Sequence, residues 1–401
     1  MISTRKIVKV DLDIVASGRT LGDFQTVVYI APVSLQDKEG NNVSQLLITG
    51  TDALGEDTSR EGAITGSEVY IQSIKNYFAN GGIKLIVAQP GTYDLDGFKN
   101  VVKNAKKLDS DFIYVCIANS AIGGADNYQI SDIQSIANYC DNSLSPNKIR
   151  IIITTGSKTF LEDYDLTDTY TIVKYCTKVV NDGIIDAGLL IGAYFSQMNL
   201  DGTDTIKDYD YTAEKLIIPD LEGDYAEDDL DDADFERMVN NTDGTGYYNF
   251  IGVVGTHRVN FGGNLATNEN IALHTDFGAI AIERDITYST LEKMLGKQYL
   301  TEQGISNIKA AINAKLQRYK TNGYLNPGAG YSGEDLVIGY NGVKYNVIKH
   351  GETLTQGFYI FSVPMQNLSV DDKAKRRFTP IYVVLETQSG ARVVEITGEV
   401  R

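Results

Sequence analysis

Apolar runs of strand length alternate with helical segments from residue 25 to about residue 195, and this alternation constrains the fold more than any other feature. The expected strands span residues 25–31, 45–50, 83–88, 112–118, 149–154 and 188–195. The expected helices span residues 67–79, 98–108, 130–139 and 170–180. Strands that are apolar throughout are typical of a sheet buried on both faces, and helices of this length connect parallel strands. The sequence therefore predicts a three-layer α/β domain with a mainly parallel sheet.

The pattern changes in the last third of the chain. An amphipathic helix is expected at residues 305–321, with one apolar face and Gly323 at its end. Asn341-Gly342 lies between two short β segments and is the strongest hairpin signal in the chain. The other expected elements are a strand at 251–254, a helix at 291–300, and strands at 336–340, 343–348, 358–363 and 381–385. This part is predicted to be α+β, with a mostly antiparallel sheet.

Charge divides the chain unevenly. Residues 201–243 contain 16 Asp+Glu and three Lys+Arg, a net charge of -13, whereas residues 244–401 carry 14 Asp+Glu and 16 Lys+Arg, a net charge of +2. With a net charge of -17, the chain is not built to bind nucleic acid. The predicted organisation is a linker arm (1–24), an α/β domain (25–200), an acidic surface insertion or loop (201–243) and a core domain (244–401) that ends in a strand at 391–401.

Both ends of the chain have sequences typical of β-strands. Their apolar residues stand at alternate positions or in short runs. An exposed strand edge recruits other chains unless it is blocked. The two ends therefore predict strand exchange between subunits. The residues expected to carry it are Val8, Val10, Leu12, Ile14, Val383, Val393, Val394, Ile396 and Val400.

Motifs that resemble catalytic or ligand-binding signatures lack the context those signatures need. The string from Gly328 to Gly333 matches a dinucleotide-binding pattern but does not follow a strand or open a helix. Residues 156–159 lack the first glycine and the Gly-Lys-Ser/Thr order of a phosphate loop. The acidic run 220–236 has no glycine where a calcium loop turns. His257, His274 and His350 have no metal-ligand spacing. We expect no catalytic residue, no cofactor and no metal.

The cysteines and the apolar runs exclude other classes of protein. Cys116, Cys140 and Cys176 are interpreted as buried free thiols rather than a disulfide pair, which fits folding in a reducing cytoplasm. No apolar run reaches the roughly 20 residues of a membrane span. The first residues do not form a signal peptide, because Asp11 and Asp13 interrupt the apolar pattern.

Three stretches in the same order resemble the contractile tail sheath proteins of bacteriophages and related injection machines. They are residues 80–87, where an Asn-Gly-Gly turn enters a strand, the Asn-Gly-Tyr-Leu-Asn-Pro-Gly turn at 322–328, and the closing block at 373–400. The resemblance implies stacked hexameric rings that form a helical homo-polymer around an inner tail tube. It also implies contraction that drives the tube through the host envelope, terminal arms that add strands to a neighbour's sheet, and baseplate and tail terminator proteins as further partners. The implied location is the virion tail, assembled in the host cytoplasm.

We further hypothesise that the helix at 305–321 faces the inner tube through the cations that flank its apolar stripe. These cations are Lys309, Lys315, Arg318 and Lys320. Ordinary solvation of a helix explains them equally well. The alternatives to a sheath are a nucleotide- or ligand-binding α/β enzyme, another self-assembling virion protein such as a baseplate component, and a surface-layer protein.

Overall fold

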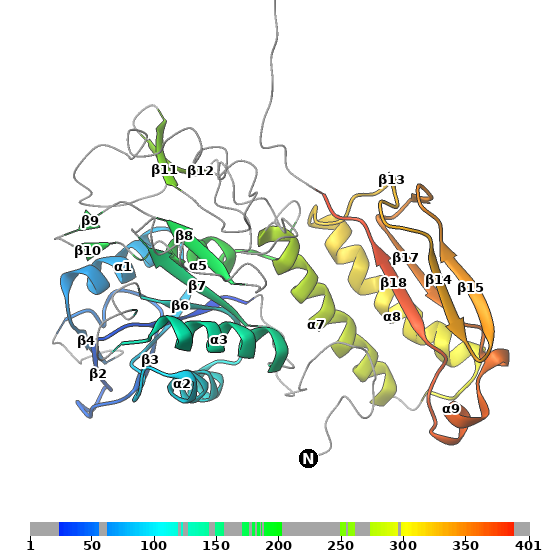
Figure 1. The fold of residues 1–401 in the computed structure, drawn as a ribbon, viewed down its shortest axis with the longest axis horizontal. Coiled ribbons are helices and arrows are strands. Elements are labelled where there is room, and N and C mark those ends of the chain that lie inside the picture. Colours follow the sequence, from blue (N-terminus) through cyan, green and yellow to red (C-terminus); the bar gives the residue numbers. More distant parts are fainter. Residues whose placement is uncertain are drawn as a thin grey trace, which may run out of the picture. The chain divides into compact units, whose positions relative to one another are not determined.

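A computed structural model describes residues 24–55, 62–118, 122, 127–143, 149–155, 171–175, 179–180, 183–184, 186, 188–202, 249–253, 256–260, 273–295 and 298–388. These residues belong to two compact units (Figure 1). The α/β unit contains the described residues up to 198 together with 249–253, 256–260 and 273. The core unit contains residues 199–202 and the described residues from 274 to 388. The predicted arms, 1–24 and 391–401, lie outside the described residues except for Phe24, and so does most of the acidic segment.

The α/β unit is built on a six-stranded sheet with the order β3-β5-β1-β6-β7-β8. Its strands are β1 (Thr26–Ile30), β2 (Ser34–Gln36), β3 (Gln45–Ile48), β4 (Ala63–Thr65), β5 (Lys84–Ala88), β6 (Phe112–Ile117), β7 (Arg150–Thr155), β8 (Ile172–Tyr175), β9 (Val179–Val180), β10 (Gly183–Ile184), β11 (Asn249–Val253) and β12 (Thr256–Asn260). Its helices are α1 (Glu68–Ala79), α2 (Leu95–Leu108), α3 (Ile130–Ser143) and α5 (Gly188–Ser196). All neighbours in the large sheet are parallel except β3, which pairs antiparallel with β5 at one edge.

Helices cover both faces of this sheet. On one face, α1 packs against α5, and α5 lies on β1, β6 and β7 (Figure 1). On the other face, α2 packs against α3, with α2 in contact with β3 and α3 in contact with β7. Every residue of β1 and β6 is buried, as the continuous apolar sequence of these strands requires. The predicted mixed α/β fold with a mainly parallel sheet is therefore present.

Two sequence predictions in this unit are wrong: a predicted helix contains strands, and a predicted strand is a helix. Residues 170–180 were expected to be helical but contain β8 and β9, in agreement with their many β-branched residues. Residues 188–195 were expected to be a strand but form α5, in which eight of nine residues are buried. A short apolar run does not distinguish a buried strand from a buried helix by its periodicity.

Two glycines one helical turn apart allow α5 to lie directly on the sheet. A β-carbon on Gly188 would be 2.6 Å from Ile152 Cγ2 and 2.8 Å from Cys116 Sγ. A β-carbon on Gly192 would be 2.9 Å from Val27 Cγ2. Glycine at positions i and i+4 on one helix face therefore permits a close approach that any side chain would prevent.

Cys116 and Cys140 are free and buried, as predicted. Burial raises the pKa of both thiols, and the carboxylate of Asp186 adds to the effect at Cys116. The thiols therefore act as small apolar core groups in the folded chain. Cys176 lies outside the described residues. Across the helices that the structure describes, none combines the length and the apolar character needed to cross a membrane.

The core unit consists of long helices and short antiparallel strand pairs. Its helices are α7 (Leu273–Leu295), α8 (Glu302–Thr321), α9 (Val370–Ala374) and the 3-10 helix η3 (Met365–Asn367). Its strands are β13 (Ala329–Gly330), β14 (Leu336–Tyr340), β15 (Val343–Ile348), β16 (Thr353–Leu354), β17 (Phe358–Ser362) and β18 (Ile381–Leu385). The dinucleotide-like string thus contains β13, which pairs with β16 and does not open a helix.

Helix α7 differs from its prediction because it begins at Leu273, whereas a helix was expected only at residues 291–300. Most of its residues are buried, including the polar residues Arg284, Asp285 and Thr287. A helix buried on most sides has no polar stripe, so the periodicity that identifies a surface helix is missing from its sequence.

Helix α8 and the β14–β15 hairpin agree with the sequence. The side chain of Thr301 accepts a hydrogen bond from Gly304 N at 3.1 Å and caps α8, whose apolar stripe from Ile305 to Tyr319 is buried. Asn341 and Gly342 have φ values of 50° and 77° and form the two-residue turn between the hairpin strands. These positive φ values are the conformation that an Asn-Gly pair adopts at low cost.

Candidate assembly surface

The candidate site is the two-stranded antiparallel ribbon formed by β17 and β18. Phe358 pairs with Leu385 at one end, Ile360 pairs with Val383 in the middle, and Ser362 pairs with Ile381 at the other end. Nine of the ten residues in the two strands are apolar or aromatic. A ribbon of this composition resembles the central strands of a larger sheet, because both faces of such strands are normally covered.

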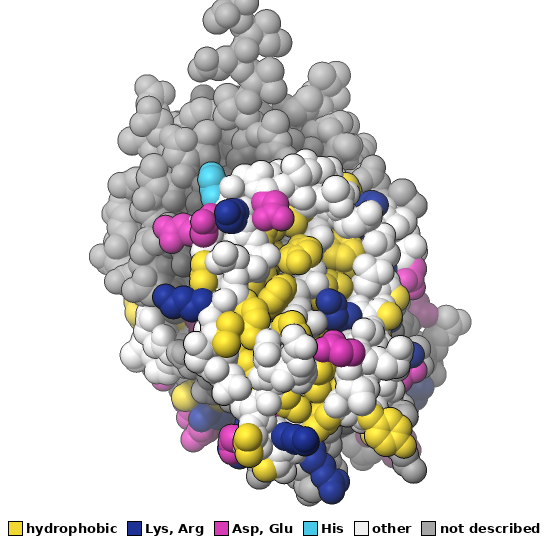
Figure 2. Space-filling view, turned by 90° about the vertical axis from the view of Figure 1, so that its right-hand side faces the viewer, with side chains coloured by type: hydrophobic (Ala, Val, Ile, Leu, Met, Phe, Trp, Pro, Cys, Tyr) yellow, Lys and Arg dark blue, Asp and Glu magenta, His cyan; other side chains and the backbone are white. Residues whose placement is uncertain are grey.

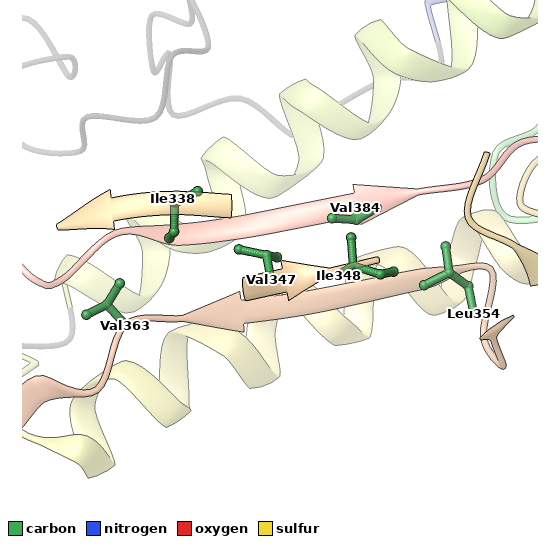
Figure 3. Close-up of a cluster of buried hydrophobic side chains, with 6 residues drawn as sticks. All are labelled: Ile338, Val347, Ile348, Leu354, Val363 and Val384. Carbon is green, nitrogen blue, oxygen red and sulfur yellow. The ribbon is translucent and has the colours of Figure 1, made fainter. Parts of the chain in front are cut away.

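One face of the ribbon packs against the β14–β15 hairpin. Val384 belongs to a buried cluster with Ile338, Val347, Ile348, Leu354 and Val363 (Figure 3). Phe361 and Tyr382, which are cross-strand partners, pack against the same cluster. Helix α8 contacts β17. Because side chains alternate along a strand, the Phe358–Leu385 and Ile360–Val383 pairs lie on the opposite face from Val384.

Despite its sequence, the ribbon is incompletely buried. Phe358 and Val384 are the two buried residues of its ten, whereas all six residues of β6 are buried. Among the described residues, β17 and β18 pair with each other and with no further strand. Each strand therefore retains an outer edge of backbone groups on an apolar ribbon, which is the geometry that accepts an added strand.

Hydrophobic side chains also gather on the side of the molecule that carries the β14–β15 hairpin (Figure 2). Val337 on β14 is 49% exposed and Val343 on β15 is 46% exposed. Tyr359 on β17 is 42% exposed. Three exposed apolar side chains thus lie on the ribbon and on the hairpin that packs against it.

The chain segment that follows β18 is fixed to the core unit on several sides. The backbone N–H of Asn326 donates to Glu386 O at 2.9 Å, and the N–H of Gln388 donates to Tyr324 O at 2.9 Å. Glu386 N donates to Gly357 O at 2.9 Å, and the His274 ring lies 3.2 Å from Gln388 O through Nε2. These contacts form a clamp on residues 386–388, so the start of the C-terminal segment has a defined position.

A buried ionic network joins α7, α8 and the segment at 200–201. Asp285 is fully buried, and its Oδ2 accepts hydrogen bonds from Arg318 Nη1 at 2.8 Å and from the Tyr319 hydroxyl at 2.9 Å. Arg284 Nε lies 3.4 Å from Asp285 Oδ1. Arg318 Nε lies 2.8 Å from both the Leu200 carbonyl oxygen and Asp201 Oδ1. Burial, and then the Asp285 carboxylate, raise the pKa of Tyr319 well above its usual value, which keeps the hydroxyl a donor.

This network changes the interpretation of one predicted tube-facing residue. The Arg318 side chain is only 17% exposed and binds groups of its own unit. Lys309 and Lys315 are half-buried on α8, and Lys320 donates to Gln356 Oε1. Sequence reasoning missed Asp285, and the only local signal for it was the charged triplet Glu283-Arg284-Asp285 between apolar residues. Whether α8 faces a tube stays a prediction that rests on Lys309, Lys315 and Lys320.

Of the predicted exchange residues, Val383 lies in β18 within the ribbon and is partly exposed. The other eight lie outside the described residues, and their roles stay predictions. His274 is buried and contacts Gln388, His350 Nδ1 lies 3.0 Å from Gly333 O, and His257 lies in β12. In the part of the chain that the structure describes, no three His, Cys, Asp or Glu side chains gather as a metal site would require.

Comparison with solved structures identifies the architecture. The chain is similar to a chain of the anti-feeding prophage baseplate, with a TM-score of 0.63 and 11% identity over 95% of this chain and 94% of that one. It is also similar to the anti-feeding prophage helical sheath in its contracted state, with a TM-score of 0.62 and 12% identity over 97% of this chain and 98% of that one. The chain has a sheath-like fold. No family model and no curated protein matches its sequence. The sheath-like fold includes both units, because the alignment covers nearly the whole of each chain.

Proposed function

We propose that the chain is the structural subunit of a contractile tail sheath. In this proposal it polymerises as stacked hexameric rings around an inner tube and contracts to drive that tube through an envelope. The supporting observation is likeness over almost the full length of a helical sheath subunit, combined with an apolar ribbon whose two edges lack partners among the described residues. The subunit would act as a building block of a phage-like particle and not as an enzyme.

Strand addition to the β17–β18 ribbon is the proposed link between subunits. The ribbon offers backbone groups on both edges, and residues 8–14 and 392–400 have strand-like sequences. Each added strand would complete backbone hydrogen bonds and cover apolar side chains. A link of this kind between different surfaces of identical chains repeats without closing and produces a helical polymer.

Electron microscopy of the purified chain tests the proposal. We expect hollow cylinders in negative stain at high protein concentration, because sheath subunits carry their own polymer contacts. A chain that stays monomeric or forms only amorphous aggregate under all ionic conditions, with and without an inner-tube protein, would contradict the proposal.

A baseplate component is the second candidate, because the baseplate chain matches this fold with an equivalent TM-score and coverage. The two functions differ in the extent of growth. A sheath subunit forms tubes of many stacked rings, whereas a baseplate component forms a closed assembly of limited height. Cylinder length in the same micrographs therefore separates the two.

Charge reversal on α8 tests the tube-facing hypothesis. Lys309→Glu together with Lys315→Glu is expected to leave a folded subunit that no longer coats inner tubes, because both lysines are partly solvent-exposed and outside the Asp285 network. Arg318 is excluded from this test, since its replacement would break a buried ion pair and alter folding. Tube coating is measured by co-sedimentation with the tube protein.

The matched control reverses two lysines on the β15 side of the unit, Lys344→Glu and Lys349→Glu, and changes the net charge by the same amount. It should coat tubes normally. Equal loss of coating in both variants would mean that net charge, and not the α8 surface, governs the contact.

A further inference from the structure

The segment from Ser369 to Arg377 forms an exposed cationic end of the core unit. Lys373, Lys375, Arg376 and Arg377 are all exposed. Lys375 is neutralised by an ion pair with Asp371. Asp372 is occupied internally, because it accepts hydrogen bonds from the Tyr340 hydroxyl and the Ser369 hydroxyl, each at 2.7 Å. We call Lys373, Arg376 and Arg377 the basic end; Asp372 interacts electrostatically with Arg377, and within the described residues no carboxylate oxygen lies at ion-pair distance from any of the three.

The basic end is held in place by a network of polar contacts. Ser369 caps α9 by accepting from Asp372 N at 3.0 Å, and Ser369 N donates to the Tyr340 hydroxyl at 3.2 Å. Asn367 Nδ2 donates to the Tyr345 hydroxyl at 2.7 Å, which ties the preceding turn to β15. Arg376 has a left-handed φ of 54°, so the chain turns sharply between the cations. The backbone that carries the three cations therefore has a fixed position, and their charges form a defined pattern.

An apolar residue accompanies these cations. Val370, in the first turn of α9, is 88% exposed. Figure 2 shows Lys and Arg side chains beside hydrophobic ones at the lower end of this side of the molecule. A partner that fits such a surface carries several carboxylates with apolar residues between them.

The chain itself contains one segment with that chemistry. Residues 220–236 include ten Asp and Glu and no Lys or Arg, with Leu221, Tyr225, Leu230 and Phe235 interspersed. We propose that the basic end of one copy binds the acidic segment 220–236 of a second copy. The proposal rests on the proposed function, in which many copies stack. A contact between two different surfaces of one chain type repeats from copy to copy and supports open-ended growth.

Charge favours this partner over a phosphate-bearing one. The whole chain has a net charge of -17, so a nucleic acid or an anionic membrane that approached the basic end would be repelled by the rest of the chain. Each copy of the chain carries one acidic segment and one basic end, so an assembly of identical copies contains equal numbers of both. The contact is exposed, so it weakens as salt shortens the screening length to about 8 Å at physiological ionic strength.

Zero-length cross-linking of the full chain tests the proposal. A carbodiimide joins the Lys373 amine to a carboxylate in direct contact, with loss of one water per amide bond formed. A mixture of unlabelled and 15N-labelled chains should give cross-linked peptides between residue 373 and the segment 220–236 that contain one labelled and one unlabelled half. Lys373→Arg keeps the charge but lacks the amine, so it should abolish this cross-link while assembly is unchanged.

A charge exchange provides the second measurement. Lys373→Glu, Arg376→Glu and Arg377→Glu together should raise the concentration needed for polymerisation about tenfold, since several partly exposed ion pairs are lost. A chain with Asp228, Asp229, Asp231 and Asp232 changed to Lys should show a similar defect, and mixing the two variants should restore assembly. The control Lys344→Glu with Lys349→Glu should polymerise normally.

The outcomes separate this proposal from the sheath proposal. Cylinders that form without any mixed-isotope cross-link would overturn the contact and leave the sheath function intact. Mixed-isotope cross-links in a chain that forms no cylinders would support the contact and contradict the sheath function. The proposed partner would be overturned if every cross-linked peptide pair carried one isotope only, since the contact would then lie within one chain. It would also be overturned if the basic end bound anionic phospholipid vesicles and gave no cross-links.

Discussion

Replacing Asp285 by alanine is expected to lower the free energy of unfolding by about 3–5 kcal/mol, because it removes the carboxylate that pairs with the buried Arg284 and the mostly buried Arg318. Asp285 is fully buried and lies 2.8 Å from Arg318 Nη1 and 3.4 Å from Arg284 Nε. Tyr319 would lose its acceptor as well. Chemical denaturation followed by circular dichroism measures the change, and the transition of the core unit should move to lower denaturant concentration.

The matched control for this variant is Asp371→Ala, which removes an ion pair of the same type at the surface. Asp371 is 68% exposed in its pair with Lys375, so its loss should leave the unfolding transition unchanged. Combining Asp285→Ala with Arg318→Met should cost less than the sum of the two single changes, because the residues interact directly. Additive costs, or a loss below about 1 kcal/mol for Asp285→Ala, would show that the network contributes little to stability.

Deleting Met1–Ser17 is expected to leave a folded chain that forms no helical polymer. In the proposed function this segment supplies a strand to the ribbon of a neighbour, and backbone hydrogen bonds along a whole strand are lost with it. The far-UV circular dichroism and the unfolding transition should match those of the full chain. Negative-stain micrographs at a concentration where the full chain forms cylinders provide the measurement.

Point substitutions within the same segment show whether polymerisation requires strand pairing by these residues or only a chain of full length. Val10→Asp with Leu12→Asp places charges on the apolar side of the expected strand and should also prevent polymers. Lys9→Ala with Asp11→Ala changes the alternate, polar side and should allow them. Cylinders formed by the deleted chain would rule out a required role for the N-terminal segment.

Local signals in the sequence predict those parts of the fold that have a polar side or a special turn. The stripe from Ile305 to Tyr319 and the Asn341-Gly342 turn are both confirmed, since each depends on contacts within a few residues. Periodicity fails where an element is covered on most sides. Helix α5 is apolar all round and was read as a strand, and α7 lacks the polar stripe that marks a surface helix.

The candidate site was predicted less completely than the fold. Val383 was identified from its strand, but the incomplete burial of the ribbon emerges only when β17 and β18 are paired in space. Arg318 was assigned to an outer surface because its position on α8 flanks the apolar stripe. Its partner Asp285 lies 33 residues earlier in the chain, and no local pattern connects two residues at that separation.

The clamp on residues 386–388 has a mechanical consequence. Its hydrogen bonds from Asn326 and Gln388 join neighbouring extended segments and lie across the direction of the chain. A pull along the chain beyond Gln388 would load these bonds together in shear, and they would resist as a group. A load that peeled the segment sideways would break them one after another at lower force. The C-terminal segment is therefore anchored so that tension along its own axis is borne first by the contacts to Tyr324, Asn326 and His274, and only then by the strand pairing of β18.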